Sequence, residues 1–205
     1  LAVSAVFQII LTAVLRLLSE AGVEWTSQEW VTWVFSFSPL YAIGFPLAFI
    51  MLKRIKTSPL SKSGLGFKNT LSAFVSNIFM MAAGNTIGML VLLVLNLLFK
   101  TDTEPAVTEL ITSSGLLWKT VVIVILAPVF EELLFRKYLI DRINPYGERF
   151  AVLFSAFLFG IFHGNFSQFF YAFGIGIVLG AVYIRTGRIA YTIAFHMFIN
   201  FLGSI

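Results

Sequence analysis

The feature that most constrains this fold is the recurrence of long apolar runs along the chain. A helix that crosses a bilayer needs about 20 mostly apolar residues. Seven runs approach or exceed that length: Leu1–Leu18, Trp30–Leu52, Leu71–Phe99, Leu116–Ile140, Phe150–His163, Phe166–Ile184 and Ile189–Ile205. The pattern predicts an all-α fold, a polytopic transmembrane helical bundle of about seven spans.

Composition indicates that most of the chain lies in lipid. Of the 205 residues, 59% are hydrophobic and 12% are charged, whereas a soluble domain usually carries about 25% charged residues. The 23 Phe residues occur along the whole length, so the apolar excess is not one anchor. We expect a single integral membrane domain over residues 1–205, with N-terminal spans in 1–115 and a second group of spans in 116–205. The overlong third run is expected to be tilted or broken near Gly84.

Charge and cysteine content exclude several classes of function. The chain has no Cys, which excludes disulfides and thiolate metal sites. The net charge of +4 comes mostly from short loops between apolar runs and forms no nucleic-acid-binding patch, so we expect no nucleic-acid partner. Membrane lipid is the expected surrounding medium.

The loops between the runs predict an orientation. Residues 53–68 carry five Lys or Arg and no acid, and Arg185 and Arg188 lie in the last loop, whereas residues 19–29 carry three Glu and no Lys or Arg. Basic loops face the cytoplasm in most membrane proteins. The chain is therefore expected to be a multi-pass protein of the cell membrane, with its N-terminus cytoplasmic and its C-terminus outside.

Three charged residues interrupt the fourth apolar run. Glu131, Glu132 and Arg136 lie where hydrocarbon would surround them. A charge at the centre of a membrane helix costs about 2.5–3.5 kcal/mol on insertion scales, so such residues pair with one another or line a polar cavity. This stretch is the first candidate for a functional site.

Helical geometry separates the two acids. Glu132 and Arg136 are four residues apart on one helix face, in the favourable order for an ion pair. Adjacent residues point about 100° apart, so Glu131 and Glu132 are not expected to face one centre together. We interpret Glu132 and Arg136 as a structural pair and Glu131 as the carboxylate that faces a cavity, where it suits a general base.

The only two histidines lie in the same half of the chain. His163 and His196 fall in or at the end of apolar runs, and the helical rise of 1.5 Å per residue places both near the depth of Glu131 and Asn200. We expect these four side chains to meet in one cavity that opens toward the cytoplasm. The alternative is that each histidine is a polar residue that holds neighbouring helices together.

His196 and Asn200 are also four residues apart, so they share one helix face. An amide and an imidazole that point at one atom can stabilise a developing oxyanion. The alternative is an interhelical hydrogen-bonding pair with no chemical role.

Three motifs in this order resemble those of a known enzyme family. They are Glu131-Glu132-x-x-x-Arg136, Phe159-x-x-x-His163 and His196-x-x-x-Asn200. The combination resembles the CPBP family (CAAX proteases and bacteriocin-processing enzymes, also called Abi), which are intramembrane endopeptidases related to the Ras-converting CAAX protease. The resemblance covers Leu116 to Ile205.

The resemblance implies a role for each motif residue. Glu131 would activate water with help from His163, and His196 and Asn200 would stabilise the oxyanion. Glu132 and Arg136 would support them, so that 116–205 forms the catalytic core. The implied activity is cleavage of a membrane-proximal or lipidated peptide.

The residues leave the role of a metal open. Glu131, His163 and His196 could hold Zn²⁺ with water in the fourth position, but the chain has no His-Glu-x-x-His helix. Direct catalysis by the glutamate is the favoured hypothesis. The competing function is a non-catalytic membrane scaffold, or an immunity or signalling protein of the same fold, and no internal repeat favours a transporter.

Overall fold

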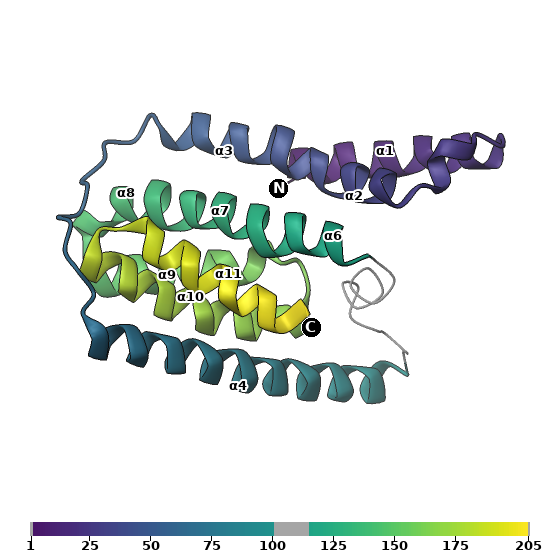
Figure 1. Cartoon of the computed structure of the whole chain (residues 1–205). Helices are drawn as coiled ribbons and strands as arrows, with labels where there is room; N and C mark the ends of the chain where they lie inside the picture. The colour runs from purple at the N-terminus through teal and green to yellow at the C-terminus, as the bar shows by residue number, and fades with distance from the viewer. Residues whose placement is uncertain (1, 101–114, 205) are drawn as a thin grey trace.

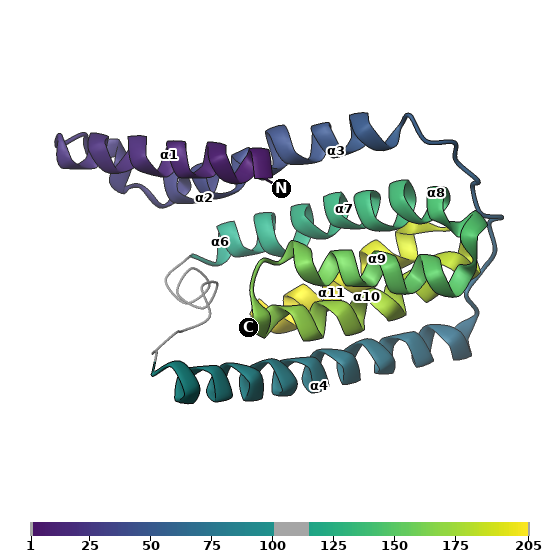
Figure 2. The same ribbon diagram turned by 180° about the vertical axis from the view of Figure 1, so that it is seen from behind.

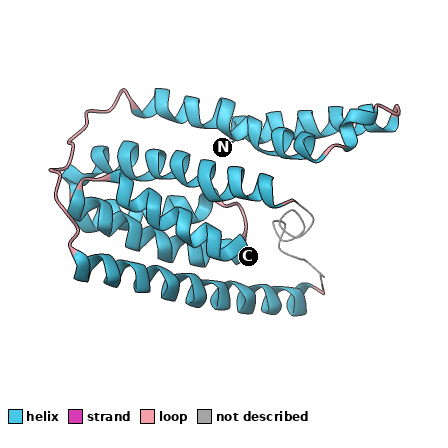
Figure 3. Cartoon of the chain, viewed as in Figure 1, coloured by secondary structure: helices cyan, strands magenta, loops and turns pink. Residues whose placement is uncertain are grey.

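The computed structural model describes residues 2–100 and 115–204, and these residues are helical with no strand among them. Figure 3 shows helices joined by short loops. The predicted all-α class is confirmed, and each of the seven predicted runs corresponds to one helical stretch. Figures 1 and 2 show α3 along one side of the C-terminal helices and α4 along the opposite side, with α1 and α2 extending beyond α6.

The N-terminal part is a hairpin of two long helical stretches. The first is α1 (Ala2–Glu20), and a short turn η1 (Glu24–Ser27) follows it. The second stretch joins α2 (Glu29–Ser38), a π-helical segment η2 (Pro39–Gly44) and α3 (Phe45–Leu52) without interruption. Pro39 opens η2, where its missing N–H leaves one carbonyl of the preceding turn without its usual donor.

The third stretch is α4 (Phe67–Phe99), an unbroken helix of 33 residues. At 1.5 Å per residue it is about 50 Å long, well above the roughly 30 Å of the hydrocarbon core. The expected break near Gly84 is absent from this helix. Gly84 and Gly88 instead lie against the backbone of Tyr171 and Ser167 on α10, closer than any Cβ could approach. These glycines bring two helices into backbone contact.

The fourth stretch is helical from Leu116 to Ile143 and contains two π-helical segments. It consists of α6 (Leu116–Trp118), the π-helical segment η3 (Lys119–Leu126), α7 (Ala127–Glu132), a second π-helical segment η4 (Leu133–Ile140) and α8 (Asp141–Ile143). A short turn η5 (Asn144–Tyr146) follows. π-helical turns occur mostly at functional sites, and here they flank the turn that carries Glu131 and Glu132.

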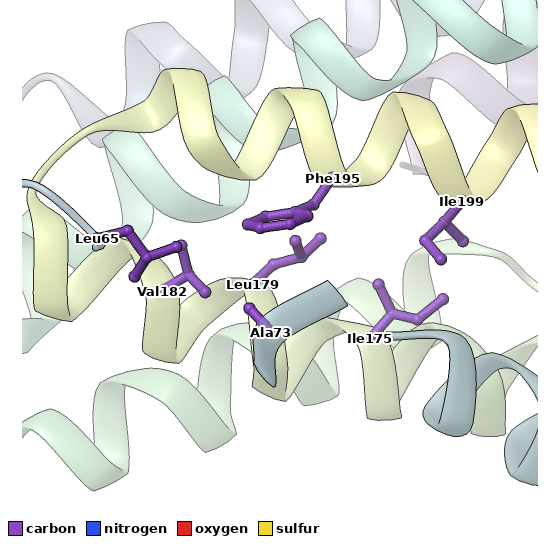
Figure 4. Close-up of a cluster of buried hydrophobic side chains, with 7 residues drawn as sticks. All are labelled: Leu65, Ala73, Ile175, Leu179, Val182, Phe195 and Ile199. Carbon is purple, nitrogen blue, oxygen red and sulfur yellow. The ribbon is translucent and has the colours of Figure 1, made fainter. Parts of the chain in front are cut away.

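Three further helices complete the bundle: α9 (Glu148–Phe162), α10 (Phe166–Thr186) and α11 (Ile189–Ser204). α10 lies between α4, α9 and α11. Asn165 caps α10, because its side-chain oxygen accepts a hydrogen bond from the Gln168 N–H at 2.8 Å. Figure 4 shows the core around α10, where apolar side chains of α4, α10, α11 and the loop before α4 meet: Leu65, Ala73, Ile175, Leu179, Val182, Phe195 and Ile199.

Four of the described helical stretches are long and apolar enough to cross a membrane: Val3–Glu20, Glu29–Leu52, Phe67–Phe99 and Phe166–Thr186. Ile189–Ser204 is apolar but shorter. Large apolar side chains are exposed along α1 and α4, as expected of lipid-facing helices. The chain is a multi-pass membrane protein.

Candidate active site

The two adjacent glutamates lie on α7 and are buried. Glu131 is 8% exposed, Glu132 is fully buried, and so is Arg136 one turn further on. The Glu132 Oε2 atom lies 3.0 Å from Arg136 Nε. This is the ion pair that the four-residue spacing predicted, and it compensates both charges away from water.

Two neighbours on α9 complete the surroundings of Arg136. Its Nη1 donates a hydrogen bond to Ser155 Oγ at 3.3 Å, and Ser155 in turn donates to the Phe135 carbonyl oxygen at 2.8 Å. The guanidinium carbon lies 4.8 Å from the centre of the Phe159 ring, within the range of a cation–π contact. Arg136 is therefore held from three directions.

His196 contacts both glutamates. Its Nδ1 lies 3.0 Å from Glu132 Oε1, and its Nε2 lies 3.7 Å from Glu131 Oε2. Adjacent helical residues point about 100° apart, and the imidazole reaches both glutamates because its two nitrogens point in different directions. Glu132 thus holds two partners, Arg136 and His196, where the sequence indicated one.

His163 directly follows the last residue of α9. Its Nδ1 lies 2.9 Å from the Phe159 carbonyl oxygen. A carbonyl oxygen can only accept, so Nδ1 carries the hydrogen and Nε2 of the neutral ring is left as an acceptor. The Phe159 ring also contacts both imidazoles, with centroids 4.9 Å from His163 and 5.5 Å from His196.

Asn200 lies one turn beyond His196 on α11. Its Nδ2 donates a hydrogen bond to the Ile123 carbonyl oxygen on η3 at 2.8 Å. This bond uses one of the two amide hydrogens and fixes the side chain, and the second hydrogen is left as a potential donor. Asn200 therefore makes an interhelical hydrogen bond and still offers an N–H that could stabilise an oxyanion, so the two alternatives for this residue are compatible.

A cavity of about 530 Å³ joins three of the four predicted residues. Glu131, His163 and Asn200 line it, together with residues of every long stretch except α1. His196 contacts Glu131 but is outside the set of described residues that line the cavity. The predicted convergence thus holds for Glu131, His163 and Asn200, with His196 beside them.

Sequence reasoning missed Tyr171 and Ser155 at this site, and it named Phe159 only as part of a motif, with no role. Tyr171 lines the cavity, and its ring centroid lies 6.0 Å from that of His163. Ser155 binds Arg136, and Phe159 touches both histidines and Arg136. An isolated Ser, Phe or Tyr in an apolar run does not by itself indicate a functional site. The spacing Phe159-x-x-x-His163 does, however, place Phe159 one helical turn from His163.

A zinc ion at this site would require Glu131, His163 and His196 to converge on one point. Glu131 and His196 approach each other, and the Nε2 of His163 is free to ligate. However, the described residues contain no group of three or more His, Cys, Asp or Glu side chains that could hold a metal ion. The zinc set of Glu131, His163 and His196 stays a prediction.

One comparison with known proteins bears on this site. Residues 113–202 match the model of the Rce1-like family, described as type II CAAX prenyl endopeptidase Rce1-like. The match covers a little under half of the chain and includes all three motifs. It confirms the resemblance to the CAAX protease family that these motifs indicated. No curated protein and no solved structure matches the chain.

Proposed function

Because residues 113–202 match the Rce1-like endopeptidases, we propose that this chain is an intramembrane endopeptidase whose reacting groups are Glu131, His163 and Asn200. The observation that carries the proposal is that a buried carboxylate and an imidazole with a free Nε2 line one cavity. A carboxylate and an unprotonated imidazole can both accept hydrogen bonds from one water, which orients its oxygen for attack on a carbonyl.

The first step is attack by water. Glu131 accepts a proton as the water oxygen bonds to the scissile carbonyl carbon, and His163 Nε2 holds the second hydrogen of that water. The carbonyl oxygen becomes an oxyanion, and the second N–H of Asn200 stabilises it. Each donor of this kind contributes about 10²–10³ in rate when it is aimed at the developing charge.

The second step is breakage of the C–N bond. The Glu132 carboxylate fixes the Nδ1–H of His196, so Nε2 faces Glu131 as an acceptor. We propose that Glu131 delivers its proton to the leaving amine, directly or after sharing it with His196. His196 was expected to stabilise the oxyanion, and its engagement by both glutamates favours this positioning and relay role instead.

The substrate class follows from the family description and the setting. The matched family is described as prenyl endopeptidases, and the cavity lies within a helical membrane bundle. We propose a membrane-proximal or lipidated peptide as substrate. The cavity combines apolar side chains with few polar ones, as pockets for amphiphilic ligands do.

The test is cleavage by the purified full chain of fluorogenic peptides ending in a farnesylated CAAX motif, with unlipidated peptides in parallel. We expect Glu131→Gln to lose at least about 10²-fold in rate, because a positioned general base contributes roughly 10²–10⁴. Glu24→Gln is the matched control, since Glu24 is exposed on η1 far along the chain from the site.

The outcome separates the two functional classes. A Glu131→Gln protein that cleaves at the wild-type rate would refute the proposed mechanism. A wild-type protein that cleaves none of these peptides, and whose Glu131 and Glu132 variants lose only stability or a bound partner, would support the scaffold alternative.

A further inference from the structure

The turn that joins α9 to α10 is held by the side chain of Asn165. The turn consists of His163, Gly164 and Asn165 (Figure 1). The Asn165 Oδ1 atom accepts hydrogen bonds from the Ser167 hydroxyl and from the Gln168 backbone N–H, both at 2.8 Å. Its Nδ2 atom donates to Gln168 Oε1 at 2.8 Å and to the His163 carbonyl oxygen at 3.3 Å. Both ends of one amide are therefore engaged.

The chemistry of these contacts fixes which end of the Asn165 amide is oxygen and which is nitrogen. A backbone N–H can only donate, so the end beside the Gln168 nitrogen must be the oxygen. A backbone carbonyl can only accept, so the end beside the His163 carbonyl must be the nitrogen. Exchanging the two ends would place donor against donor and acceptor against acceptor.

Asn165 in turn orients the side chain of Gln168. Because Nδ2 of Asn165 donates, the atom of Gln168 that faces it must be the acceptor Oε1. The Nε2 atom of Gln168 is then directed away from Asn165. It makes no hydrogen bond with any residue that the structure describes, so both of its hydrogens are left for a ligand.

Gln168 lines the same cavity as Glu131 and His163. It lies in the first turn of α10 and is half-buried, so a molecule in the cavity can reach it. The Nδ2 atom of Asn165 contacts both the His163 carbonyl oxygen and Gln168 Oε1. Gln168 is therefore a close neighbour of His163 on this wall of the cavity.

A neutral amide donor suits a neutral acceptor. Each residue of a peptide offers one backbone carbonyl, which is a strong acceptor that must be satisfied when it leaves water. Consecutive Cα atoms are about 3.8 Å apart, so the carbonyl beside a scissile bond lies within a few ångströms of the reacting centre. None of the described residues that line the cavity is Lys or Arg, so the lining favours backbone carbonyls over carboxylates.

We propose that Gln168 is a substrate-binding residue whose Nε2 donates a hydrogen bond to a substrate backbone carbonyl next to the scissile bond, and that Asn165 is the positioning residue that directs this donor into the cavity. The proposal rests on the proposed peptidase function for the identity of the ligand. It assigns the two ends of the Asn165 amide to different tasks, since Oδ1 caps α10 and Nδ2 orients Gln168.

The first test replaces the donor. Gln168→Met keeps a similar side-chain length without a hydrogen-bonding amide. In steady-state cleavage of the farnesylated fluorogenic peptide by the full chain, KM should rise roughly 3- to 10-fold, as expected for one neutral hydrogen bond, with kcat unchanged. Gln28→Met is the matched control, because Gln28 is exposed and its side chain makes no capping bond to α2.

The second test separates capping from positioning. Asn165→Ser keeps a side-chain oxygen that can cap α10 but has no amide to orient Gln168. We expect the denaturant midpoint of unfolding to stay unchanged and KM to rise. The double variant Asn165→Ser/Gln168→Met should have the KM of Gln168→Met alone, because both substitutions remove the same contact. A purely structural Asn165 would instead lower the midpoint and add its effect to that of Gln168→Met.

Equilibrium binding tests the same contact without cleavage. Anisotropy of a fluorescent farnesylated peptide is measured with Glu131→Gln and with Glu131→Gln/Gln168→Met. The second protein should bind the peptide roughly 3- to 10-fold more weakly. Equal affinities would overturn the role of Gln168, as would a lowered kcat with unchanged KM, which would assign Gln168 to the oxyanion. Additive effects in the double variant with Asn165→Ser would overturn the role of Asn165.

These outcomes are distinct from failure of the proposed function. A wild-type protein that cleaves none of the peptides, but binds them with the expected dependence on Gln168, would refute the peptidase activity and retain the binding site. A wild-type protein that cleaves them, and whose Gln168→Met variant has unchanged KM and affinity, would refute this inference and retain the activity.

Discussion

At the scale of single residues, Glu132 holds the site together. It is fully buried and contacts both Arg136 and His196. We expect Glu132→Gln to lower the free energy of unfolding by about 3–5 kcal/mol, because the substitution leaves the buried guanidinium uncompensated. Denaturant titration of the purified full chain in mixed micelles measures this change.

An exposed ion pair of the same spacing provides the control. Arg16 and Glu20 lie 3.5 Å apart on α1, with both side chains largely exposed. Glu20→Gln should change the free energy of unfolding by less than about 1 kcal/mol, because surface pairs contribute little. Equal effects of the two substitutions would contradict the role assigned to Glu132.

Asn200 is predicted to act on the transition state and not on substrate binding. Asn200→Ala should lower kcat by about 10²–10³ with little change in KM, as expected when one oxyanion donor is lost. Steady-state kinetics with the farnesylated peptide separates the two constants. A raised KM with unchanged kcat would instead assign Asn200 to substrate binding.

The sequence identified the polar residues of the site but not all of their contacts. Glu131 and His163 were predicted because ionisable groups in apolar runs are rare, and Asn200 because it lies four residues from His196. The structure places all three on one cavity. Of the two glutamates, Glu131 lines the cavity and Glu132 pairs with Arg136. The contact of His196 with both carboxylates was not predicted. The 100° between adjacent helical residues gives the direction of each side chain, but not that His196 offers a separate nitrogen to each carboxylate.

At the scale of elements, the close approach of α4 and α10 positions one wall of the cavity. A methyl group on Gly84 would collide with the backbone of Tyr171, which itself lines the cavity. We expect Gly84→Ala to lower the free energy of unfolding by about 1–3 kcal/mol, the usual cost of overpacking, and to reduce peptide cleavage.

Gly203 offers a matched helical control. A Cβ at Gly203 on α11 would have nothing within 4 Å, so Gly203→Ala should be neutral or stabilising by up to about 1 kcal/mol in the same unfolding titration. A Gly84→Ala protein as stable as Gly203→Ala would show that the backbone contact between α4 and α10 is not required.

The helices themselves were largely predictable, because each apolar run of sufficient length gave one helical stretch. Their ends were less so: α4 begins at Phe67 rather than Leu71, and α10 continues to Thr186. The π-helical segments that flank α7 were not predicted. Apolar periodicity reports which face of a helix is buried, not how tightly the helix is wound.

At the scale of the whole molecule, the two ends of the helical bundle differ. The end at which α3 connects to α4 carries most of the Lys and Arg residues, and the loop of residues 53–66 is hydrogen-bonded across it to Asp141 and Thr186. The other end contains the cavity. Charge counting predicted the first property, but the second needed the packed structure, since distances along separate helices do not tell which end of a bundle is filled.

The central claim is that Glu131 and His163 act as one unit on one water molecule. The most direct test measures peptide cleavage by the wild type, Glu131→Gln, His163→Ala and the double variant. Each single substitution should cost at least about 10² in kcat/KM, and the double variant should lose little more than the worse single one, as residues of one catalytic unit do. Multiplicative losses, or a Glu131→Gln protein with wild-type activity, would contradict the claim.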